Sequence, residues 1–374
     1  MHNRTLLIYH FFPRYREEFI KLAAARGWHF AADTVSTDEA MEGVDPQIFA
    51  GRFYPVRNVW IRSFLWQRSL LKLVSEQSWD AIVLVGSPLY LTNYIVTAYA
   101  RARGIKVFFW THGIRPGAKL WKRIVSSVAL SGAHGLFVYG KLARTQLSFP
   151  WLPIRKIHVV YNSLNSVERE TNPVVSKDLG SRKSLEVSGF FGITASVMIF
   201  VGRLVERKRL DLALRALHRA RSLGTPLGLL IVGEGPAEGS LKQLVSELNL
   251  SDAVMFFGAT YDESTLTSLF QASSFAVFPH AAGLGVIHAM RQGLPVLTDN
   301  DLSAHGPEVE FVIDGVSGIV CQSNSLVALS DGMVSMYRGR GSFDNTTVSA
   351  RVSKIFTPEF QMSVMERAIE GATS

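Results

Sequence analysis

The sequence predicts an α/β protein made of two doubly wound domains, and three observations lead to this prediction. Short apolar runs of strand length alternate with helix-length amphipathic segments, a pattern typical of parallel sheets covered by helices. This series occurs twice, on either side of a stretch at 163–195 that is rich in Ser, Asn, Gly and charge. The 374 residues, 47% of them hydrophobic, are enough for two domains that each bury a core.

The first domain is expected to span residues 1–165. Helix-length segments such as Arg16–Arg26 and Leu91–Arg103 separate its strands. The expected strands are Thr5–Tyr9, Ala81–Val85, Lys106–Trp110, Gly135–Val138 and Ile157–Tyr161.

The second domain is expected to span residues 166–357 and repeats the pattern. Its expected strands are Val197–Val201, Gly228–Val232, Ala253–Phe257, Phe275–Phe278, Pro295–Thr298 and Gly318–Cys321. Its expected helices are Leu210–Ser222, Ala237–Leu248, Glu263–Gln271 and Val286–Arg291. A last helix is expected within 358–374, and it can pack back on the first domain.

The sequence shows no pattern of a targeting or membrane-spanning segment and contains one cysteine. The longest apolar runs, such as Met198–Val201, are strand-sized and far too short to span a membrane. The first residues lack the long apolar region and the small-residue cleavage site of a signal peptide, so a cytoplasmic location is expected. The single cysteine, Cys321, excludes an internal disulfide. Because Cys321 ends an apolar run, it is interpreted as a packing residue rather than a nucleophile.

The excess of positive over negative charge is confined to the first half of the chain. Residues 1–160 contain 21 Lys and Arg against 9 Asp and Glu, whereas residues 161–374 contain 18 against 22. A basic half suggests an anionic partner, unless the charge only keeps the surface soluble. The partner classes are a membrane surface, a lipid-linked phosphate or nucleic acid. No motif that reads nucleic acid accompanies the basic residues, so nucleic acid is not expected.

The segment Arg115–Val128 is the most distinctive basic stretch of this half. Its Lys and Arg residues alternate with apolar ones and include Trp121, a residue type that favours membrane interfaces. The segment is interpreted as a basic amphipathic helix that either rests on an anionic membrane or packs on the sheet.

Phosphate-binding residue types follow two strands of the second half. In open α/β sheets, ligands bind at the carboxyl ends of strands. Gly202 follows the first of these strands, Arg203 offers a bidentate fork to phosphate oxygens, and Lys208 adds a second charge before the next helix. Gly233 opens a Gly-Glu-Gly-Pro turn after the next strand, which alone is a weak dinucleotide-like signal.

The stretch 278–296 is the most specific, because it is expected to run strand, glycine loop, short helix, Gly-x-Pro and strand. Backbone N–H groups around Gly283, Leu284 and Gly285 are expected at a helix N-terminus, where a diphosphate is stabilised. His280 precedes this loop, and His288 lies inside the helix, where its ring can reach a ribose or sugar hydroxyl.

Four pieces of the second half resemble the retaining GT-B glycosyltransferases of family four, also called glycosyl transferases group 1. The pieces are Phe200–Leu204, Leu230–Pro236, Val254–Gly258 and the stretch 278–296, and they occur in the family's order and at comparable spacing. The resemblance implies two Rossmann-like domains facing a cleft. It also implies a nucleotide-diphosphate sugar donor that is bound without a metal.

The resemblance assigns roles to several residues. Arg203 and Lys208 match the family's diphosphate-binding pair, and Phe257 and Gly258 match the strand end whose backbone meets the base. His112, which follows an expected strand, matches a position where many members carry an active-site histidine beside the donor sugar. The mechanism implied is front-face, with the leaving diphosphate taking the acceptor proton, so no enzymatic nucleophile is needed.

The chain departs from the family at its two glutamates. His280 and His288 occupy these positions, with the spacing of eight residues kept. A neutral imidazole offers one acceptor and one donor, whereas a carboxylate accepts two hydroxyls. Either the histidines bind the donor with altered geometry, or the helix is shifted and Glu308 supplies the missing acceptor. A third interpretation is that both histidines are packing residues.

Two further motifs carry less weight. The glycine-rich loop that the family often has after its first strand is absent, because His10, Arg14 and Arg16 stand there, so acceptor recognition does not transfer. The run Asp299-Asn300-Asp301 imitates the metal motif of a different glycosyltransferase fold, and we assign it no metal.

The sequence therefore predicts a metal-independent glycosyltransferase that moves a sugar, with retention, from a nucleotide-diphosphate sugar to an acceptor. The acceptor is expected to be lipid-linked or a polysaccharide or lipopolysaccharide, and the enzyme to be cytoplasmic or peripheral on the inner face of the cell membrane. One alternative is a nucleotide-sugar epimerase of the same fold. The other is a non-catalytic nucleotide-sugar-binding scaffold, which the loss of both glutamates favours.

Overall fold

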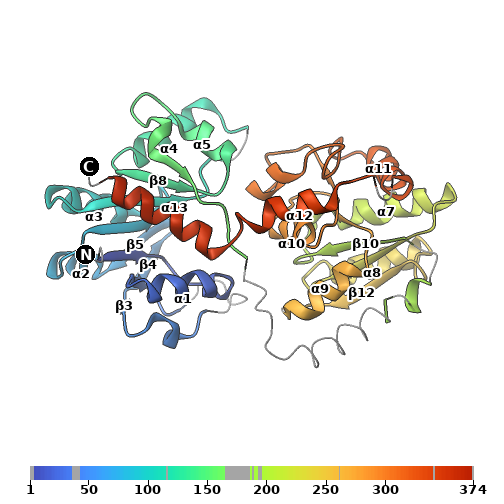
Figure 1. The fold of residues 1–374 in the computed structure, drawn as a ribbon, viewed down its shortest axis with the longest axis horizontal. Coiled ribbons are helices and arrows are strands. Elements are labelled where there is room, and N and C mark those ends of the chain that lie inside the picture. Colours follow the sequence, from blue (N-terminus) through green and yellow to red (C-terminus); the bar gives the residue numbers. More distant parts are fainter. Residues whose placement is uncertain are drawn as a thin grey trace. The chain divides into compact units, whose positions relative to one another are not determined.

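A computed structural model describes residues 4–35, 43–114, 117–164, 186–187, 189–192, 196–260, 262–339 and 342–372. The chain forms two compact units (Figure 1). Unit 1 consists of Met1–Ser166 together with Ile355–Ser374, and unit 2 consists of Val167–Lys354. Each unit is built on one parallel sheet, as the alternating pattern predicts.

The sheet of unit 1 has the strand order β3-β2-β1-β6-β7-β8-β9, and every neighbouring pair is parallel. Its strands are β1 Thr5–Ile8, β2 His29–Ala32, β3 Phe53–Pro55, β6 Ala81–Val85, β7 Lys106–Thr111, β8 Gly135–Val138 and β9 Ile157–Val159. Its helices are α1 Glu17–Ala25, α2 Leu70–Glu76, α3 Leu91–Ala102, α4 Leu120–Leu130, α5 Lys141–Leu147 and α13 Pro358–Gly371.

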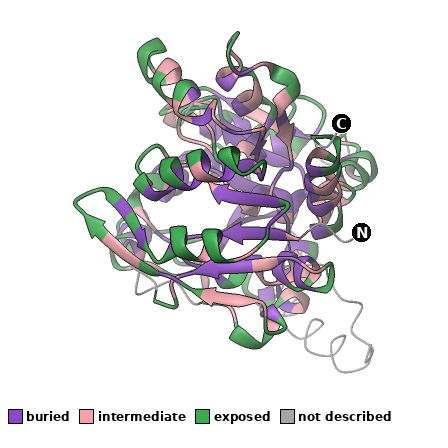
Figure 2. Cartoon of the chain, turned by 90° about the vertical axis from the view of Figure 1, so that its left-hand side faces the viewer, coloured by how far each residue is buried: buried purple, intermediate pink, exposed green. Residues whose placement is uncertain are grey.

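Both faces of this sheet are buried, which explains why its strands are nearly continuous apolar runs. On β1, Leu6 packs in the core with helices α2 and α3, whereas the next residue, Leu7, packs in the core with α1 and α13. Figure 2 shows buried strands enclosed by helices whose outer faces are exposed. The carboxyl ends of the strands are therefore the part of the sheet left for ligands.

Helix α13 belongs to unit 1, although the whole of unit 2 precedes it in the chain (Figure 1). Met362, Met365 and Ile369 are buried in the core of unit 1 beside α1. The Gln361 amide donates a hydrogen bond of 2.6 Å to the carbonyl of Tyr161.

Two strands and a hairpin of unit 1 are missing from the sequence expectations. Strands β2 and β3 are only 4 and 3 residues long and include alanine and proline, which are poor strand signals. The hairpin consists of β4 Arg57–Ile61 and β5 Phe64–Arg68 and forms its own antiparallel pair.

The sheet of unit 2 has the order β12-β11-β10-β13-β14-β15 and is also parallel throughout. The order reverses between β10 and β13, which is where doubly wound sheets bind ligands. The strands are β10 Ser196–Val201, β11 Leu227–Val232, β12 Val254–Gly258, β13 Phe275–Phe278, β14 Val296–Asp299 and β15 Gly318–Cys321. The helices are α7 Leu210–Ser222, α8 Glu238–Glu247, α9 Glu263–Gln271, α10 Leu284–Arg291, α11 Leu326–Arg338 and α12 Asn345–Ser353.

The strands and helices expected in unit 2 are confirmed to within two residues. Of the expected basic segment, Arg115 lies outside the described residues, and helix α4 begins at Leu120. The expected connection at 163–195 also lies largely outside them. None of the helices described here combines the length and the apolar character that crossing a membrane requires.

Candidate functional site

The loops that follow β10 and β11 in unit 2 are joined by backbone hydrogen bonds. Gly202 N–H donates to Val232 at 3.0 Å, and Leu204 N–H donates to Glu234 at 2.8 Å. This pairing explains two glycines of the Gly-Glu-Gly-Pro turn. A Cβ atom on Gly233 would lie 2.0 Å from the Gly202 carbonyl oxygen, and one on Gly235 would lie 2.3 Å from that of Leu204.

The end of β12 is held to the same pair of loops. Gly233 N–H donates to the carbonyl of Gly258 at 2.8 Å, and Gly258 adopts a left-handed φ of 88°. A Cβ atom on Gly258 would meet nothing within 4 Å. The backbone at Phe257 and Gly258 thus lies beside the loop after β11, as expected for neighbouring strand ends.

Lys208 connects this group of loops to the glycine loop after β13. It lies in a short 3-10 helix, η4 Glu206–Lys208, and its ammonium donates a hydrogen bond to the carbonyl of Ala281. Burial, and next the positive charge of Arg207, lowers the pKa of Lys208 to about 8, while Glu308 acts in the opposite direction. The side chain of Arg203 is exposed at the end of β10.

The loop between β13 and α10 is strained at one end and open at the other. Ala281 is buried and adopts φ 47°, a left-handed conformation that costs free energy for a residue with a side chain. Gly283 is the N-cap of α10, and a Cβ atom there would meet nothing within 4 Å. The Val286 amide of α10 donates to the Gly283 carbonyl at 2.9 Å, whereas the amides of Leu284 and Gly285 precede the bonds within the helix and carry the positive end of its dipole.

Gly285, in the first turn of α10, has a packing role. A Cβ atom on it would lie 2.7 Å from the carbonyl oxygen of Val201 and 2.8 Å from the ring of Phe278. Glycine at this position therefore lets the N-terminus of α10 approach the end of β10, next to the Arg203 and Lys208 loop.

Glu308 lies under the same loop. It is buried in a 3-10 helix, η5 Pro307–Phe311, and a Cβ atom on Gly306 would lie 2.4 Å from its carboxylate Oε2. Gly306 N–H donates to the carbonyl of Ala282 at 2.7 Å. The carboxylate thus lies beside the glycine loop and close enough to Lys208 to affect its pKa.

A network around Asp299 was not anticipated from the sequence. Its carboxylate lies 2.7 Å from His280 Nδ1 and 2.7 Å from His305 Nε2, and it accepts a hydrogen bond from Ser323 at 3.1 Å. Burial acts to raise the pKa of Asp299, but the hydrogen bonds from His305 and His280 outweigh it and lower the pKa to about 2. The pairing of β13 with β14 was the available signal, since parallel strands bring their carboxyl ends together.

This network fixes the orientation of both histidines. An ionised carboxylate only accepts, so His280 Nδ1 and His305 Nε2 carry protons. His305 Nδ1 in turn accepts from the Ala282 N–H at 2.9 Å. Asp299 thus engages Nδ1 of His280, and His305 ties the strand end to the glycine loop.

The same network explains the run Asp299-Asn300-Asp301. The Asp301 carboxylate accepts hydrogen bonds from the backbone and the hydroxyl of Ser303. Within the described ranges, no three side chains of His, Cys, Asp or Glu gather in a way that could hold a metal ion.

His288 faces a different neighbour from His280. Its ring stacks on Phe270 of α9, with the ring centroids 6.5 Å apart and an interplanar angle of 8°. Burial, together with Arg291, lowers the pKa of His288 to about 4, so the imidazole is neutral at pH 7. Its role in donor binding stays a prediction.

His112 lies in unit 1, where it lines a pocket of about 420 Å³ at the carboxyl ends of β1, β6, β7 and β8. Its ring packs on Tyr139 with a centroid distance of 4.4 Å. Although part of the residue is exposed, these surroundings desolvate the ring and, with Arg16, lower the pKa of His112 to about 4. The imidazole is thus a neutral hydrogen-bonding group.

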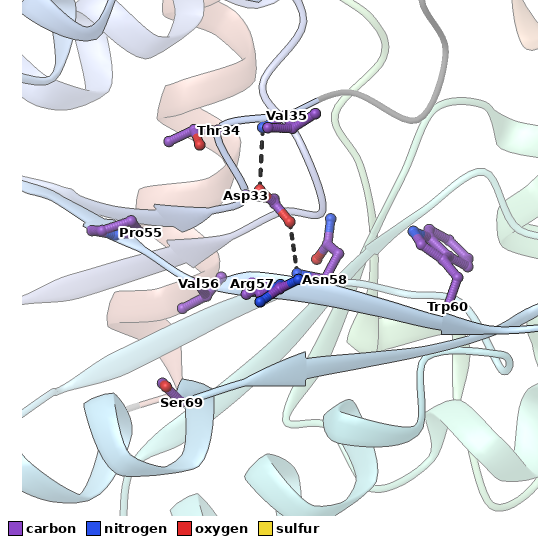
Figure 3. A pocket seen from close by; sticks show the side chains of 9 residues that line it. All are labelled: Asp33, Thr34, Val35, Pro55, Val56, Arg57, Asn58, Trp60 and Ser69. Carbon is purple, nitrogen blue, oxygen red and sulfur yellow. Dashed lines mark hydrogen bonds between the residues drawn. The ribbon is translucent and has the colours of Figure 1, made fainter.

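A second pocket of unit 1, of about 630 Å³, is lined in part by the hairpin strand β4 (Figure 3). Asp33 accepts hydrogen bonds from the backbone of Asn58 at 2.7 Å and of Val35 at 3.1 Å. Trp60 lies on the same strand and packs edge-on against Tyr90, with centroids 6.0 Å apart. Because Tyr90 lines the first pocket, the two pockets are neighbours.

Comparison with known sequences finds that part of the second unit matches a protein family. Residues 189–348 match the family described as Glycosyl transferases group 1. The putative colanic acid biosynthesis glycosyltransferase WcaL of Salmonella typhimurium is 26% identical over 166 residues, which are 42% of this chain and 39% of that protein. The GDP-mannose-dependent alpha-(1-6)-phosphatidylinositol monomannoside mannosyltransferase of Mycolicibacterium smegmatis is 28% identical over 143 residues, 36% of each chain. Both matches therefore span less than half of the curated relatives' length.

Solved structures resemble nearly the whole chain. HepE of Anabaena, in complex with UDP, has a TM-score of 0.71 at 16% identity, covering 97% of this chain and 99% of that one. A glycosyltransferase from Rickettsia africae has a TM-score of 0.73 at 13% identity, covering 100% of both chains. WaaG, a glycosyltransferase involved in lipopolysaccharide biosynthesis, has a TM-score of 0.58 at 16% identity, covering 99% and 100%. The chain thus has the GT-B fold of glycosyltransferases, and its residues 189–348 are similar to glycosyl transferases group 1.

Proposed function

We propose that the protein is a glycosyltransferase that uses a nucleotide-diphosphate sugar and acts with retention. The observation that carries this proposal is the hydrogen bond from Lys208 to Ala281. It joins the basic loop after β10 to the glycine loop that opens α10. Cationic groups and helix amides therefore converge at one point of the sheet edge, where they suit a diphosphate.

The protein's contribution to the reaction is positioning and charge stabilisation. In the front-face reaction, the acceptor oxygen bonds to the anomeric carbon as the bond to the diphosphate breaks. The acceptor proton passes to the departing diphosphate, whose growing charge is stabilised by Arg203, Lys208 and the amides of α10. No metal is required for this charge balance. The structures of HepE with UDP and with UDP-glucose support a donor of this class.

The acceptor is assigned to the pockets of unit 1. Trp60 is 38% exposed and offers an aromatic face, and the neighbouring polar groups of Asp33 and Asn58 suit sugar hydroxyls. His112, neutral and beside the other pocket, suits a hydroxyl of the reacting sugars. Curated relatives named for colanic acid and amylovoran biosynthesis support a glycan or lipid-linked acceptor.

Calorimetric titration with nucleoside diphosphates tests the donor site. Arg203→Ala and Lys208→Ala should each weaken binding, since each loses a charge-assisted contact of about 1.5–3 kcal/mol. Arg215→Ala is the matched control, because Arg215 is an exposed cation on α7, away from the strand ends. Unchanged affinity in both site variants would remove the donor assignment. Product analysis without an acceptor separates transfer from epimerisation.

We also propose that unit 1 rests on an anionic membrane through helix α4. Leu120, Trp121, Val125 and Val128 are 54–59% exposed, and Lys119 and Lys122 flank them. Trp151 extends this surface, since it is 45% exposed and its indole N–H donates to Ser127 of α4 at 3.0 Å. Apolar side chains bordered by basic ones are typical of helices that lie in a membrane interface.

Vesicle flotation tests the membrane proposal. The double variant Trp121→Ser and Val125→Ser should lose binding to phosphatidylglycerol vesicles, whereas Val327→Ser should not. Val327 is a suitable control because it is 51% exposed on α11 of unit 2. Equal flotation with neutral and anionic vesicles would contradict the electrostatic part of the proposal.

A further inference from the structure

Arg16 is a buried cation beneath the smaller pocket of unit 1. It is only 3% exposed, and its guanidinium carbon lies 4.3 Å from the ring centroid of Trp110. The rings of Tyr9, Tyr15 and Tyr139 lie at 5.4, 5.2 and 5.5 Å. All four aromatic residues also line the pocket. The positive charge therefore lies directly behind the pocket wall.

No counter-charge balances this guanidinium among the described residues. It donates a hydrogen bond to the hydroxyl of Tyr139 and also interacts with that of Tyr9, and no carboxylate of the described residues forms an ion pair with it. Burial raises the pKa of Tyr139 and of Tyr9, so both hydroxyls are neutral at pH 7. Burying a charge without a counter-charge costs free energy, so a purely structural role does not account for a cation at this position.

The group also has more donors than acceptors. A guanidinium carries five N–H donors and no acceptor, and the Nε of Arg16 is buried with no hydrogen-bond partner. The Trp110 Nε1 is in the same condition. Tyr139 accepts from Arg16, and its own hydroxyl forms a hydrogen bond with that of Tyr9. What this wall of the pocket lacks is a negatively charged acceptor.

The field of Arg16 extends into the pocket. Desolvation first, and Arg16 second, lowers the pKa of both His10 and His112, two residues that line it. Both imidazoles are consequently neutral at pH 7. They leave a pocket with neutral hydrogen-bonding groups and a single buried positive charge.

We propose that the Arg16 pocket binds an oxyanion, a phosphate or a carboxylate, carried by the acceptor. The proposal rests on the proposed transferase function and names the chemical class of its acceptor. Arg16 supplies the charge from behind the wall. A neutral glycan without such a group is expected to bind weakly.

The test follows Trp110 by fluorine NMR in the full chain labelled with 5-fluorotryptophan. The chain has 7 tryptophans, and Trp110→Phe identifies the resonance. Methyl phosphate and methyl glucuronate are titrated separately, so that the two anion sources are distinguished, with methyl glucoside as the neutral control. A saturable shift with either anion, at least tenfold weaker in Arg16→Gln, is the expected result. No saturable shift in the wild type, or an equal shift and affinity with methyl glucoside, overturns the proposal.

Matched variants keep the test decisive. Arg14→Gln removes the same charge from the same turn, where the residue is exposed, and should retain wild-type affinity. Tyr139→Phe keeps Arg16 and removes the hydroxyl that holds its guanidinium, so it should weaken binding of the anion about threefold or more and serves as the test if Arg16→Gln fails to fold. Affinity equal to wild type in both Arg16→Gln and Tyr139→Phe overturns the proposal.

The donor site is read out independently. Lys208→Ala changes unit 2 and should leave the Trp110 shift unaltered. Titration of UDP into the same samples by calorimetry reports on that site alone. In the wild type, an intact anion shift without any UDP binding would count against the transferase proposal, whereas UDP binding without an anion shift would count against the anion pocket.

Discussion

The carboxylate of Asp299, at the end of β14, holds the imidazole of His280, at the end of β13, through a 2.7 Å hydrogen bond to Nδ1. The same carboxylate holds His305, which is bonded to the glycine loop. One buried acid thus orients a predicted site residue and the loop that follows it. His280, which the resemblance aligns with a glutamate of the family, thus has its own fixed partner.

Asp299→Asn should destabilise unit 2 and misorient His280. In the wild type, hydrogen bonds lower the pKa of Asp299 to about 2. They stabilise the fold at pH values above the ordinary carboxyl pKa near 4, and this stabilisation is lost as the pH falls from about 4 to about 2. Asparagine removes the charge and keeps one acceptor oxygen, so its NH2 group faces the second imidazole N–H donor to donor, and we expect unfolding to become easier by about 2–4 kcal/mol. Urea denaturation at pH 7 and pH 3 measures this, and a wild-type unfolding free energy at pH 7 would contradict it.

Donor affinity should depend on the charge of Lys208. Because burial, with Arg207, lowers its pKa to about 8, the ammonium loses its proton as pH rises above that value. A bound diphosphate favours the charged form, so affinity should be constant below about pH 7.5 and fall up to tenfold per unit above about pH 8. Lys208→Arg keeps a charge at all these pH values and should abolish the decline. Titrations from pH 6 to 10 provide the measurement, and an identical decline in both proteins would refute the assignment.

Gly233→Ala and Gly235→Ala should both destabilise unit 2, because each Cβ would overlap a backbone carbonyl oxygen. We expect a loss of about 2–4 kcal/mol for each, together with weaker nucleotide binding. Gly239→Ala is the control: its Cβ would meet nothing within 4 Å on helix α8, and it should stabilise by about 0.5–1 kcal/mol. Equal thermal unfolding temperatures of the three variants would contradict this prediction.

His288 can be tested without disturbing its packing. His288→Phe keeps a ring against Phe270 and removes the hydrogen-bonding nitrogens. If His288 contacts the donor, both His288→Phe and His288→Ala should weaken nucleotide-sugar binding, by roughly 1 kcal/mol for one hydrogen bond. Wild-type binding by His288→Phe would identify the residue as part of the core only.

Trp60→Ala should raise the KM for the acceptor and leave that for the donor unchanged, because Trp60 lines the larger pocket of unit 1. Trp66→Ala, on the partner strand of the same hairpin and 37% exposed, is the matched control. Steady-state kinetics with each substrate varied in turn would show it. An equal rise in acceptor KM for both variants would point to a general effect of the hairpin.

The fold of unit 2 was predictable because its strands are apolar runs separated by long amphipathic helices. In unit 1, strands β2 and β3 were missed, since His29–Ala32 and Phe53–Pro55 are short and take their strand character from β1. Tertiary pairing, rather than local propensity, decides such segments.

The site was predictable only where its residues share a motif. The loops around Lys208 and Gly283 were expected to meet, and the bond from Lys208 to Ala281 joins them. The roles of Asp299 and His305 depend on which strands are neighbours, which the motifs do not reveal. Arg16 was noted only as one of the residues after the first strand, because the burial of a cation leaves no mark in the charge pattern.

The position of α13 bears on how the chain is made. Unit 2 lies between the two segments of unit 1, and the buried methionines of α13 complete the core beside α1. During synthesis from the N-terminus, unit 2 is finished before unit 1 receives its last helix. The unit that emerges first from the ribosome is therefore the last to become complete, with its apolar face beside α1 uncovered until then.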